Sequence, residues 1–396
     1  MAVFAMGVIG SKMSCFSTVN FEFSQKAIAD SVKKAGLLSI ELELSLRCNF
    51  KCPYCYVPDT NYFEEELLEE EIRDVILQAK EMGAKKITIL GGEPTIYPGI
   101  LEIVRFISQN NLQVEIFSNG SGITADFAKE LFANNVRMVL KKNTLNEELQ
   151  DKLTGKEGAF KIINSALENL QNAGYPSNKG HLANKGNLAN KGHSENTEHP
   201  ANTEHPVNTE HPANREHSVN NSFLAVSSVI CKQNIAELPD FWQWLRNRNI
   251  VPYFEIITPQ ANAKINDWLE VPKNQLQKLF QEISDIDRKK YGFNWDPQPP
   301  LMGNRCLRHQ FSCLVTSKGD ITPCVGVTIP LGNIREQTLS NIIKNSSVLN
   351  DLKNYQKTIK GPCGKCEKSD GCYGCRGAAY QLTGDYLASD PLCWLI

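Results

Sequence analysis

The most chemically informative residues are three cysteines in one short loop, Cys48, Cys52 and Cys55, which follow a C-x3-C-x2-C pattern. A cubane cluster has four irons and normally takes four thiolate ligands. Three thiolates this close together can hold one cube and leave its fourth iron without a protein ligand. An open coordination position is typical of a catalytic metal, because a substrate or cofactor binds there. Arg47 and Lys51 would offset the negative charge of such a cluster. The alternative is a structural zinc ion whose fourth ligand lies elsewhere in the chain.

A second set of cysteines lies near the C-terminal end of the sequence. Eight of the 13 cysteines fall between Cys306 and Cys393, several of them in tight C-x2-C pairs, and no export signal precedes them. In a reducing cytosol this pattern indicates metal ligation rather than disulfides, so we expect a cytoplasmic protein. One or two zinc-ribbon sites are an alternative, although a ribbon usually separates its pairs by about 15–20 residues and here the gap is shorter. Cys15 and Cys231 are expected to be free thiols.

Two polar segments that follow expected strands could contact a ligand at the cysteine loop. The first segment consists of Gly91, Gly92, Glu93 and Pro94. Its glycines would let the backbone approach a bound molecule closely, and its carboxylate could accept a hydrogen bond from an ammonium group. The second segment contains Ser118 and Asn119. Taken alone, each segment is also consistent with a plain turn.

The cysteine loop, with Tyr54 just before its third cysteine, resembles the signature of the radical SAM superfamily. The resemblance implies that the open iron chelates the amino and carboxylate groups of S-adenosylmethionine. One electron from the cluster would cleave this cofactor to a 5′-deoxyadenosyl radical, which abstracts a hydrogen from the substrate. The segment 91–94 resembles the family's GGEP motif, which holds the methionyl amino group, and Ser118 with Asn119 resembles the polar strand end near the cofactor.

The fourth strand departs from the family pattern. Many relatives carry a serine and an aspartate there for the cofactor's ribose, whereas this chain has Lys141, Lys142 and Asn143. We therefore expect ribose contacts from Lys141 and Asn143. Glu255, on the sixth expected strand, could face the interior as an acid or base. It could equally be a structural carboxylate with a charged partner.

The C-terminal cysteines resemble the SPASM domain, which binds two auxiliary [4Fe-4S] clusters. Two residues separate the last two cysteines of the central run, where the family pattern has three. The resemblance assigns one cluster to Cys306, Cys313, Cys324 and Cys375. It assigns the other to Cys363, Cys366, Cys372 and Cys393. The expected cofactors are thus S-adenosylmethionine and three [4Fe-4S] clusters.

Enzymes of the SPASM type mostly modify ribosomally made peptides or proteins. We therefore expect a peptide or protein maturase that takes electrons from a partner such as flavodoxin or ferredoxin. A small-molecule enzyme, for example in cofactor biosynthesis, is the alternative. Sulfatase maturation is less favoured, because Val325 stands where those relatives place an aspartate. A non-catalytic electron-transfer protein is also disfavoured, because it leaves the open iron and the segment 91–94 without a purpose.

Apolar periodicity places these residues on alternating strands and helices. Strands are expected at 39–46, 86–90, 113–118, 136–141, 223–229 and 252–257, and helices at 65–82, 98–110, 124–134, 159–173 and 239–248. Such β-α repeats imply an α/β fold, with a parallel sheet and helices outside. Right-handed crossovers would curl the sheet into a partial (β/α)6 barrel of the TIM type. Active residues of these sheets gather at the carboxyl ends of strands, where the cysteine loop falls.

The expected organisation is an N-terminal extension (1–37), the barrel (38–257), a helical connector (258–305) and a small cysteine-rich domain (306–396) with a β-hairpin and short helices. Residues 177–220 carry six-residue repeats without an aromatic residue, which predicts a disordered insertion. Six of the seven histidines lie there, so weak metal binding is an alternative to an inert repeat. The net charge of −2 gives no electrostatic case for nucleic acid or a membrane surface. No apolar run approaches the ~20 residues of a membrane span.

Overall fold

Six parallel strands form the central sheet of the protein. The computed structural model describes residues 23–58, 65–176 and 222–396. Each strand pairs in parallel with the next one along the chain. The strands are β1 (Ser39–Glu43), β2 (Lys86–Leu90), β3 (Gln113–Ser118), β4 (Arg137–Lys141), β5 (Leu224–Ile230) and β6 (Val251–Ile256). The predicted α/β class and the order of the six strands are therefore confirmed.

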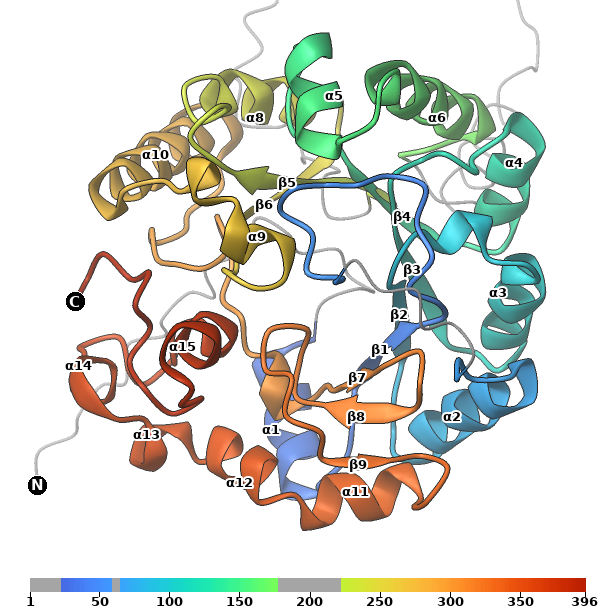
Figure 1. Cartoon of the computed structure of the whole chain (residues 1–396), viewed down its shortest axis with the longest axis vertical. Coiled ribbons are helices and arrows are strands. Elements are labelled where there is room, and N and C mark those ends of the chain that lie inside the picture. Colours follow the sequence, from blue (N-terminus) through green and yellow to red (C-terminus); the bar gives the residue numbers. More distant parts are fainter. Residues whose placement is uncertain (1–22, 59–64, 177–221) are drawn as a thin grey trace, which may run out of the picture.

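Helices cover the outer side of this sheet, as Figure 1 shows. They are α2 (Glu69–Glu81), α3 (Ile100–Gln109), α4 (Ala125–Ala133), α6 (Ala159–Ala173) and α8 (Leu238–Arg246). In α2, Ile72, Val75, Ile76 and Ala79 recur at helical spacing and are buried against the strands. Thr124 caps α4, because its hydroxyl accepts a hydrogen bond from the amide of Phe127 at 3.2 Å.

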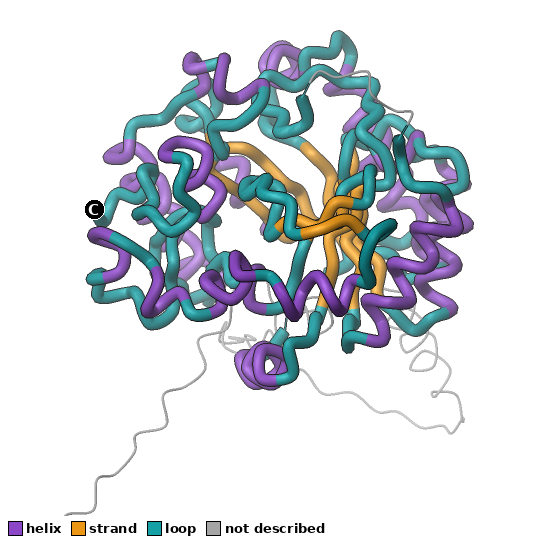
Figure 2. The backbone as a smooth tube through the Cα atoms, turned by 60° about the horizontal axis from the view of Figure 1, so that its bottom comes forward, coloured by secondary structure: helices purple, strands orange, loops and turns teal. Residues whose placement is uncertain are grey.

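The sheet does not close on itself but continues into the C-terminal part of the chain. The strand order is β6-β5-β4-β3-β2-β1-β7-β8-β9. Strand β7 (Leu314–Val315) runs parallel to β1, and β8 (Asp320–Thr322) and β9 (Gly332–Asn333) follow in antiparallel pairing. The β-hairpin predicted for the cysteine-rich domain is formed by β7 and β8, and it belongs to the same sheet as the barrel strands. Figure 2 shows these strands as one continuous group with helices around its outer side.

The alternation of β1 defines the two faces of the sheet. Ile40 and Leu42 are fully buried in the apolar core with the outer helices. Glu41 and Glu43 point to the opposite face, because successive side chains of a strand alternate. That face lines the interior of the open barrel. On the far edge, β6 is covered by the segment around Leu301, since the amide of Ile256 donates to the carbonyl of Pro300 at 3.0 Å.

The expected connector is helical. It contains α9 (Asn262–Ile265), the 3-10 turn η4 (Asp267–Leu269), α10 (Lys273–Ile286) and a π-helical turn (Asp287–Tyr291). The buried carboxylate of Asp287 joins it to the barrel, because it accepts hydrogen bonds from Arg246 and Trp242 of α8 at 2.7 Å each. The Trp394 ring packs edge-on against Phe280 of α10 with centroids 4.8 Å apart. The C-terminal end is therefore packed against the connector.

Short helices complete the C-terminal part. They are the 3-10 turn η6 (Arg308–Gln310), α11 (Leu339–Asn345), α12 (Ser347–Lys353), α13 (Tyr355–Thr358), α14 (Gly361–Gly364) and α15 (Arg376–Thr383). Three further elements were not expected: α1 (Gln25–Lys33), the 3-10 turn η1 (Pro94–Ile96) and α5 (Glu147–Thr154). The predicted insertion 177–220 lies outside the described residues. Within the described ranges, no helix is both long and apolar enough to cross a membrane.

Candidate active site and cluster sites

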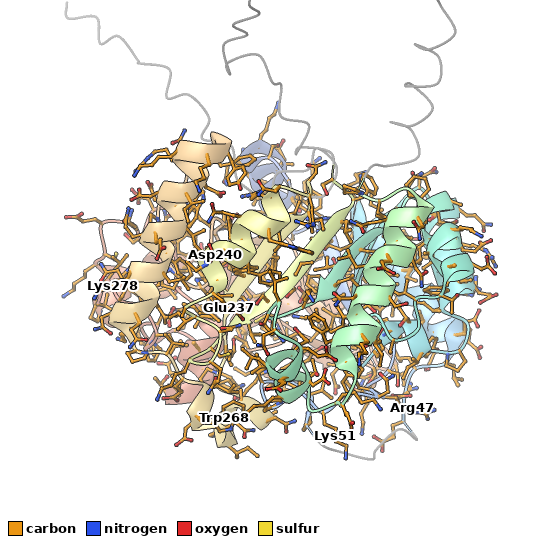
Figure 3. All side chains as sticks on the ribbon, turned by 90° about the horizontal axis from the view of Figure 1, so that it is seen from above. Arg47, Lys51, Glu237, Asp240, Trp268 and Lys278 are labelled. Atoms are coloured by element: carbon orange, nitrogen blue, oxygen red, sulfur yellow. The ribbon has the colours of Figure 1, made fainter. Side chains whose placement is uncertain are left out.

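The loop that carries Cys48, Cys52 and Cys55 follows β1 and crosses the carboxyl ends of the strands (Figure 1). Loops after several other strands converge on it. The amide of Lys51 donates to the carbonyl of Thr154 at 3.1 Å, behind β4. Asn262, behind β6, donates from its amide to the carbonyl of Cys55 at 3.2 Å. Figure 3 shows Lys51 on the same side of the molecule as Arg47 and Trp268. The predicted location of the loop is thus confirmed.

Glycines at 91 and 92 are required by a close approach of two backbone segments. The amide of Gly92 donates to the carbonyl of Ser45 at 2.8 Å, and the amide of Glu93 donates to the carbonyl of Arg47 at 2.8 Å. A Cβ at Gly92 would lie 2.0 Å from the Arg47 carbonyl oxygen, and one at Gly91 would lie 2.4 Å from that of Ser45. Gly91 also has φ +124°. The glycines thus admit the entry to the cysteine loop, and their predicted close approach to a ligand stays a prediction.

The carboxylate of Glu93 binds two strand ends together. Its Oε1 accepts hydrogen bonds from the amide and hydroxyl of Thr95 at 2.9 and 2.5 Å and from the hydroxyl of Ser118 at 2.7 Å. Its Oε2 accepts from the amide of Asn119 at 2.5 Å. Only 3% of the residue is exposed. Burial raises the pKa of Glu93, and the four donors oppose that rise. The segment 91–94 and the end of β3 are therefore one rigid unit.

This unit contacts the first cysteine. The side-chain amide of Asn119 donates to Asn49 Oδ1 at 3.1 Å and lies 3.8 Å from the sulfur of Cys48. Burial raises the pKa of Cys48 to about 11 and that of Cys52 to about 12, and the charges of the neighbouring loop cysteines contribute to both. The three thiols therefore share one site, with Cys48 exposed and Cys52 and Cys55 half-buried. Iron, when bound by these three cysteines, would supply the positive charge that converts their thiols to thiolates.

Tyr54, which is half-buried, and Asn143 form a hydrogen-bonded pair beside this loop. The side-chain amide of Asn143 donates to the Tyr54 hydroxyl at 2.7 Å, and its carbonyl oxygen accepts from the amide of Val229 at 3.1 Å. Asn143 is fully buried. Both of its polar groups are used within the protein, so the structure gives it the role of holding Tyr54 against β5. The sequence had predicted a ribose contact for Asn143.

Lys141 and Glu255 meet in the interior of the barrel. The Lys141 ammonium lies 2.8 Å from the Ser227 hydroxyl and 3.2 Å from Glu255 Oε1. Both side chains are 31% exposed, and the Lys141 nitrogen lies 5.6 Å from the centre of the Phe117 ring. The positive charge of Lys141 also acts to lower the pKa of Cys52, against the larger effect of burial. Glu255 therefore has a charged partner, which is the arrangement expected if it is a structural carboxylate. The two side chains form an ion pair near the cysteine loop.

Two further interior acids were not anticipated. The Tyr56 hydroxyl donates to Glu43 Oε1 at 3.0 Å, and burial raises the pKa of Glu43 to about 7. Glu41 pairs with Arg308, which belongs to the cysteine-rich part of the chain. The period-two alternation of β1 could have revealed both acids, since apolar residues flank each of them. No sequence pattern indicated their partners.

The last four predicted cluster cysteines come together. The pKa of Cys372 is raised by burial and in part by the charges of Cys363 and Cys366. Burial raises the pKa of Cys393 to about 12, and the charges of Cys363 and Cys372 contribute to this rise. The loop before Cys393 is fixed by Asp390, a fully buried residue whose carboxylate accepts from the amide of Cys375 at 2.7 Å. These four thiols fit a fully ligated cubane.

Of the other four predicted ligands, the structure brings together three. Cys306 and Cys324 are both among the charged neighbours of Cys375, and Cys306 acts on Cys324 as well. Cys313 does not join them. It is 1% exposed in the apolar core, and the charges that act on it are those of Glu41 and Lys353 rather than those of a cysteine.

Several buried polar groups around this site have no hydrogen-bond partner. They are the ring nitrogens of His309, the hydroxyl of Tyr373, and Nε and Nη2 of Arg376. Burial raises the pKa of Tyr373, and the charges of Cys306 and Cys324 contribute to this rise. Burial, together with two nearby guanidinium groups, lowers the pKa of His309 to about 3, so its ring is neutral. Native proteins rarely leave buried polar groups unpaired, and a polar group bound at this site would satisfy them.

The described cysteines form no disulfide. Across the described residues, no three His, Cys, Asp or Glu side chains converge closely enough to hold a single metal ion. The ligands of a cubane bind different irons and therefore lie farther apart than the ligands of one zinc ion. The residues present fit iron–sulfur clusters at all three places.

Two family models match the chain. The radical SAM superfamily model covers residues 42–186, which include the cysteine loop and the segment 91–94. The chain belongs to the radical SAM superfamily. The model of the SPASM iron–sulfur cluster-binding domain covers residues 306–367. This enzyme therefore uses S-adenosylmethionine with a [4Fe-4S] cluster, and its SPASM domain binds additional iron–sulfur clusters.

Known proteins are similar to this radical SAM protein over most of its length. An AdoMet-dependent heme synthase of Methanosarcina barkeri is 26% identical, over 89% of this chain and 95% of that protein. Mycofactocin maturase MftC of Mycolicibacterium smegmatis is 24% identical, over 89% of this chain and 81% of that protein. The structure of Streptococcus suis SuiB bound to S-adenosylmethionine matches with a TM-score of 0.61 at 16% identity, covering 93% of this chain and 81% of that one. SuiB therefore shares the fold.

Proposed function

We propose that this enzyme generates a 5′-deoxyadenosyl radical at the site of Cys48, Cys52 and Cys55 and uses it to modify a ribosomally made peptide or protein. The observation that carries the radical step is the grouping of three thiols, one of them exposed, beside the unit formed by Glu93 and Asn119. When bound, the cluster and S-adenosylmethionine supply the radical chemistry. The protein contributes orientation and the exclusion of side reactions.

Individual residues have distinct proposed roles toward the cofactor. Carbonyl and hydroxyl oxygens around the segment 91–94 would accept hydrogen bonds from the methionyl ammonium group. The carboxylate of Glu93 would provide the negative charge that balances this ammonium group. Ser118 and Asn119 would fix the position of Glu93, because they donate hydrogen bonds to it. Tyr54 would close one side of the site. Lys141 would be available to the ribose or the substrate, because it extends into the interior.

The SPASM domain would hold two auxiliary [4Fe-4S] clusters. We assign Cys363, Cys366, Cys372 and Cys393 to one of them, and Cys306, Cys324 and Cys375 to the other. The second site reaches the barrel interior through Arg308, which pairs with Glu41 of β1. An auxiliary cluster there could accept the electron that a substrate radical must lose. We propose a small redox protein such as flavodoxin or ferredoxin as the electron donor, and the cytoplasm as the compartment, because these sites need reduced thiols.

The peptide substrate is supported by the SPASM domain and by the relationship to a mycofactocin maturase. In addition, SuiB, which shares the fold, has been solved bound to the precursor peptide SuiA. A heme precursor is a second candidate, because the AdoMet-dependent heme synthase relative matches 95% of its own length. Lys141 and Arg308 are cations that could bind the carboxylates of either substrate.

The experiment that separates these substrates follows hydrogen transfer. Reconstituted enzyme is incubated with S-adenosylmethionine, dithionite and either a deuterated peptide encoded next to its gene or a deuterated heme-precursor porphyrin. We expect deuterium in 5′-deoxyadenosine and a mass change in the peptide. Deuterium transfer from the porphyrin and not from the peptide would identify the heme precursor as the substrate. Lys141→Met would serve as a variant that retains the clusters but weakens substrate binding.

A further inference from the structure

The first auxiliary site has three thiols, whereas a cubane normally takes four protein ligands. Cys306, Cys324 and Cys375 are close enough to act on one another electrostatically. Cys313, the eighth cysteine of the C-terminal part, is the obvious fourth ligand in the sequence. The position of Cys313 in the sheet decides whether it can take that role.

The register of β7 against β1 places Cys313 on the wrong face. Leu314 lies opposite Glu41, and Val315 lies opposite Leu42. Because side chains alternate along a strand, Leu314 shares the interior face of Glu41, where Arg308 also lies. Cys313 therefore points with Val315 toward the outer helices, and both belong to the apolar core that contains Leu42. The sheet itself separates its thiol from the other three.

His309 is a polar side chain with no partner at this site. It is the one histidine outside the repeats at 177–220, it is 2% exposed, and neither ring nitrogen makes a hydrogen bond. Leaving a buried polar group unsatisfied costs about 1–3 kcal/mol. A folded protein keeps such a residue when a bound group satisfies it.

The imidazole of His309 lies beside Tyr373, which is close to two of the three thiols. His309 is three residues after Cys306 and belongs to the 3-10 turn η6, which begins two residues after Cys306. Its ring centroid is 5.4 Å from that of Tyr373. The hydroxyl of Tyr373 is in turn close enough to Cys306 and Cys324 to be affected by their charges. Tyr373 also directly precedes the loop to Cys375. The imidazole is therefore connected to this group of thiols through Tyr373.

We propose that this auxiliary [4Fe-4S] cluster is ligated by the thiolates of Cys306, Cys324 and Cys375 and by the imidazole of His309, and that Cys313 is a core thiol. The inference rests on the cluster content proposed above. A neutral imidazole makes the cluster one charge less negative than a fourth thiolate would. Replacing thiolate by imidazole raises the reduction potential of an iron–sulfur cluster. The site would therefore accept an electron more readily than its fully thiolate-ligated neighbour, which has Cys363, Cys366, Cys372 and Cys393.

The direct test detects nitrogen on the cluster. The full chain with Cys48, Cys52 and Cys55 replaced by alanine is loaded with iron and sulfide, reduced with dithionite and studied by pulsed electron paramagnetic resonance. We expect a strong nitrogen coupling that changes from the ¹⁴N to the ¹⁵N pattern when the protein contains ¹⁵N-histidine. A reduced auxiliary signal without histidine nitrogen coupling would overturn the proposal.

Two variants test the ligand exchange in the otherwise intact enzyme. Cys313→Ser should keep about twelve irons, four in each of three clusters, and the nitrogen coupling. His309→Cys should also keep about twelve irons, because a fourth thiolate replaces the imidazole, but it should lose the coupling and lower the potential of that cluster. Loss of about four irons in Cys313→Ser, or an unchanged potential in His309→Cys, would contradict the assignment.

The outcome is separable from the proposed function. Cleavage of S-adenosylmethionine depends on the cluster at Cys48, Cys52 and Cys55, whereas the nitrogen signal belongs to the SPASM domain. Normal formation of 5′-deoxyadenosine without a histidine signal would refute only the His309 ligand. A histidine signal without cleavage would refute only the proposed radical function.

Discussion

Replacing Gly92 by alanine should detach the cysteine loop from the barrel. The new Cβ would lie 2.0 Å from the Arg47 carbonyl oxygen, a distance that no real contact reaches. Neither side can easily move. The segment after Gly92 is fixed by the four hydrogen bonds to Glu93, and Arg47 directly precedes Cys48. The loop must therefore shift away from β2.

The cost can be worked from the contacts that are lost. The shift breaks two hydrogen bonds of 2.8 Å, from the amides of Gly92 and Glu93 to the loop. Each contributes about 1 kcal/mol to stability. Overpacking adds about 1–3 kcal/mol, for a total loss of about 3–5 kcal/mol in the free energy of unfolding. Displacement of Cys48 should also remove the radical cluster, so iron should fall from about twelve to about eight per chain.

The measurement combines urea unfolding, iron content and 5′-deoxyadenosine formation. Gly158→Ala is the matched control, because Gly158 has φ +76° and a Cβ there would meet nothing within 4 Å. That variant should lose only the about 1–2 kcal/mol of left-handed backbone strain and keep every cluster. If Gly92→Ala retains full iron and a stability within about 1 kcal/mol of the wild type, the close approach is not what holds the loop.

Three other perturbations have defined outcomes. Because the pKa of Glu43 is raised to about 7, the folded protein binds this proton more tightly than the unfolded chain, so stability should fall as the pH rises from about 4.5 to about 7. The free energy of unfolding, measured with urea at pH 5 and pH 8, should fall by about 3 kcal/mol in the wild type and should not fall in Glu43→Gln. The same pH dependence in both proteins would refute the raised pKa of Glu43. Arg308→Met removes a positive charge beside Cys306 and Cys324, so redox titration should show a potential lower by tens of millivolts, whereas Arg308→Lys should show a smaller change. The amide of Phe223 donates to the carbonyl of Pro176 at 2.8 Å, so the two ends of the repeat segment meet. A short glycine-serine linker in place of the repeats should therefore leave the rate of cofactor cleavage within about twofold of the wild-type rate. A large loss of cleavage in a cluster-loaded variant would assign the repeats a role.

The sequence was most informative where the chemistry is local. Spacing alone placed the three thiols of the cysteine loop after β1, and helical periodicity identified the outer helices, because each pattern depends on neighbouring residues. The role of Gly92 could be only half predicted. Glycine signalled a close approach, but the approaching group, the Arg47 carbonyl, comes from a segment about 45 residues away.

Long-range placement was the part that the sequence could not provide. Cys313 was counted as a ligand because spacing says nothing about which face of a strand a side chain occupies, and that depends on the pairing of β7 with β1. The pairing of Glu255 with Lys141 and of Glu41 with Arg308 likewise depends on how distant strands and loops meet. His309 carries no motif. Its importance appears only when both ring nitrogens are found buried and unpaired.

The central claim is that Cys48, Cys52 and Cys55 hold the cluster that cleaves S-adenosylmethionine. The most direct test measures 5′-deoxyadenosine after anaerobic reconstitution, reduction with dithionite and addition of S-adenosylmethionine. Wild-type enzyme with about twelve irons should form it, and Cys48→Ala should form none while retaining about eight irons. Absence of 5′-deoxyadenosine from fully loaded wild-type enzyme, or its undiminished formation by Cys48→Ala, would contradict the account.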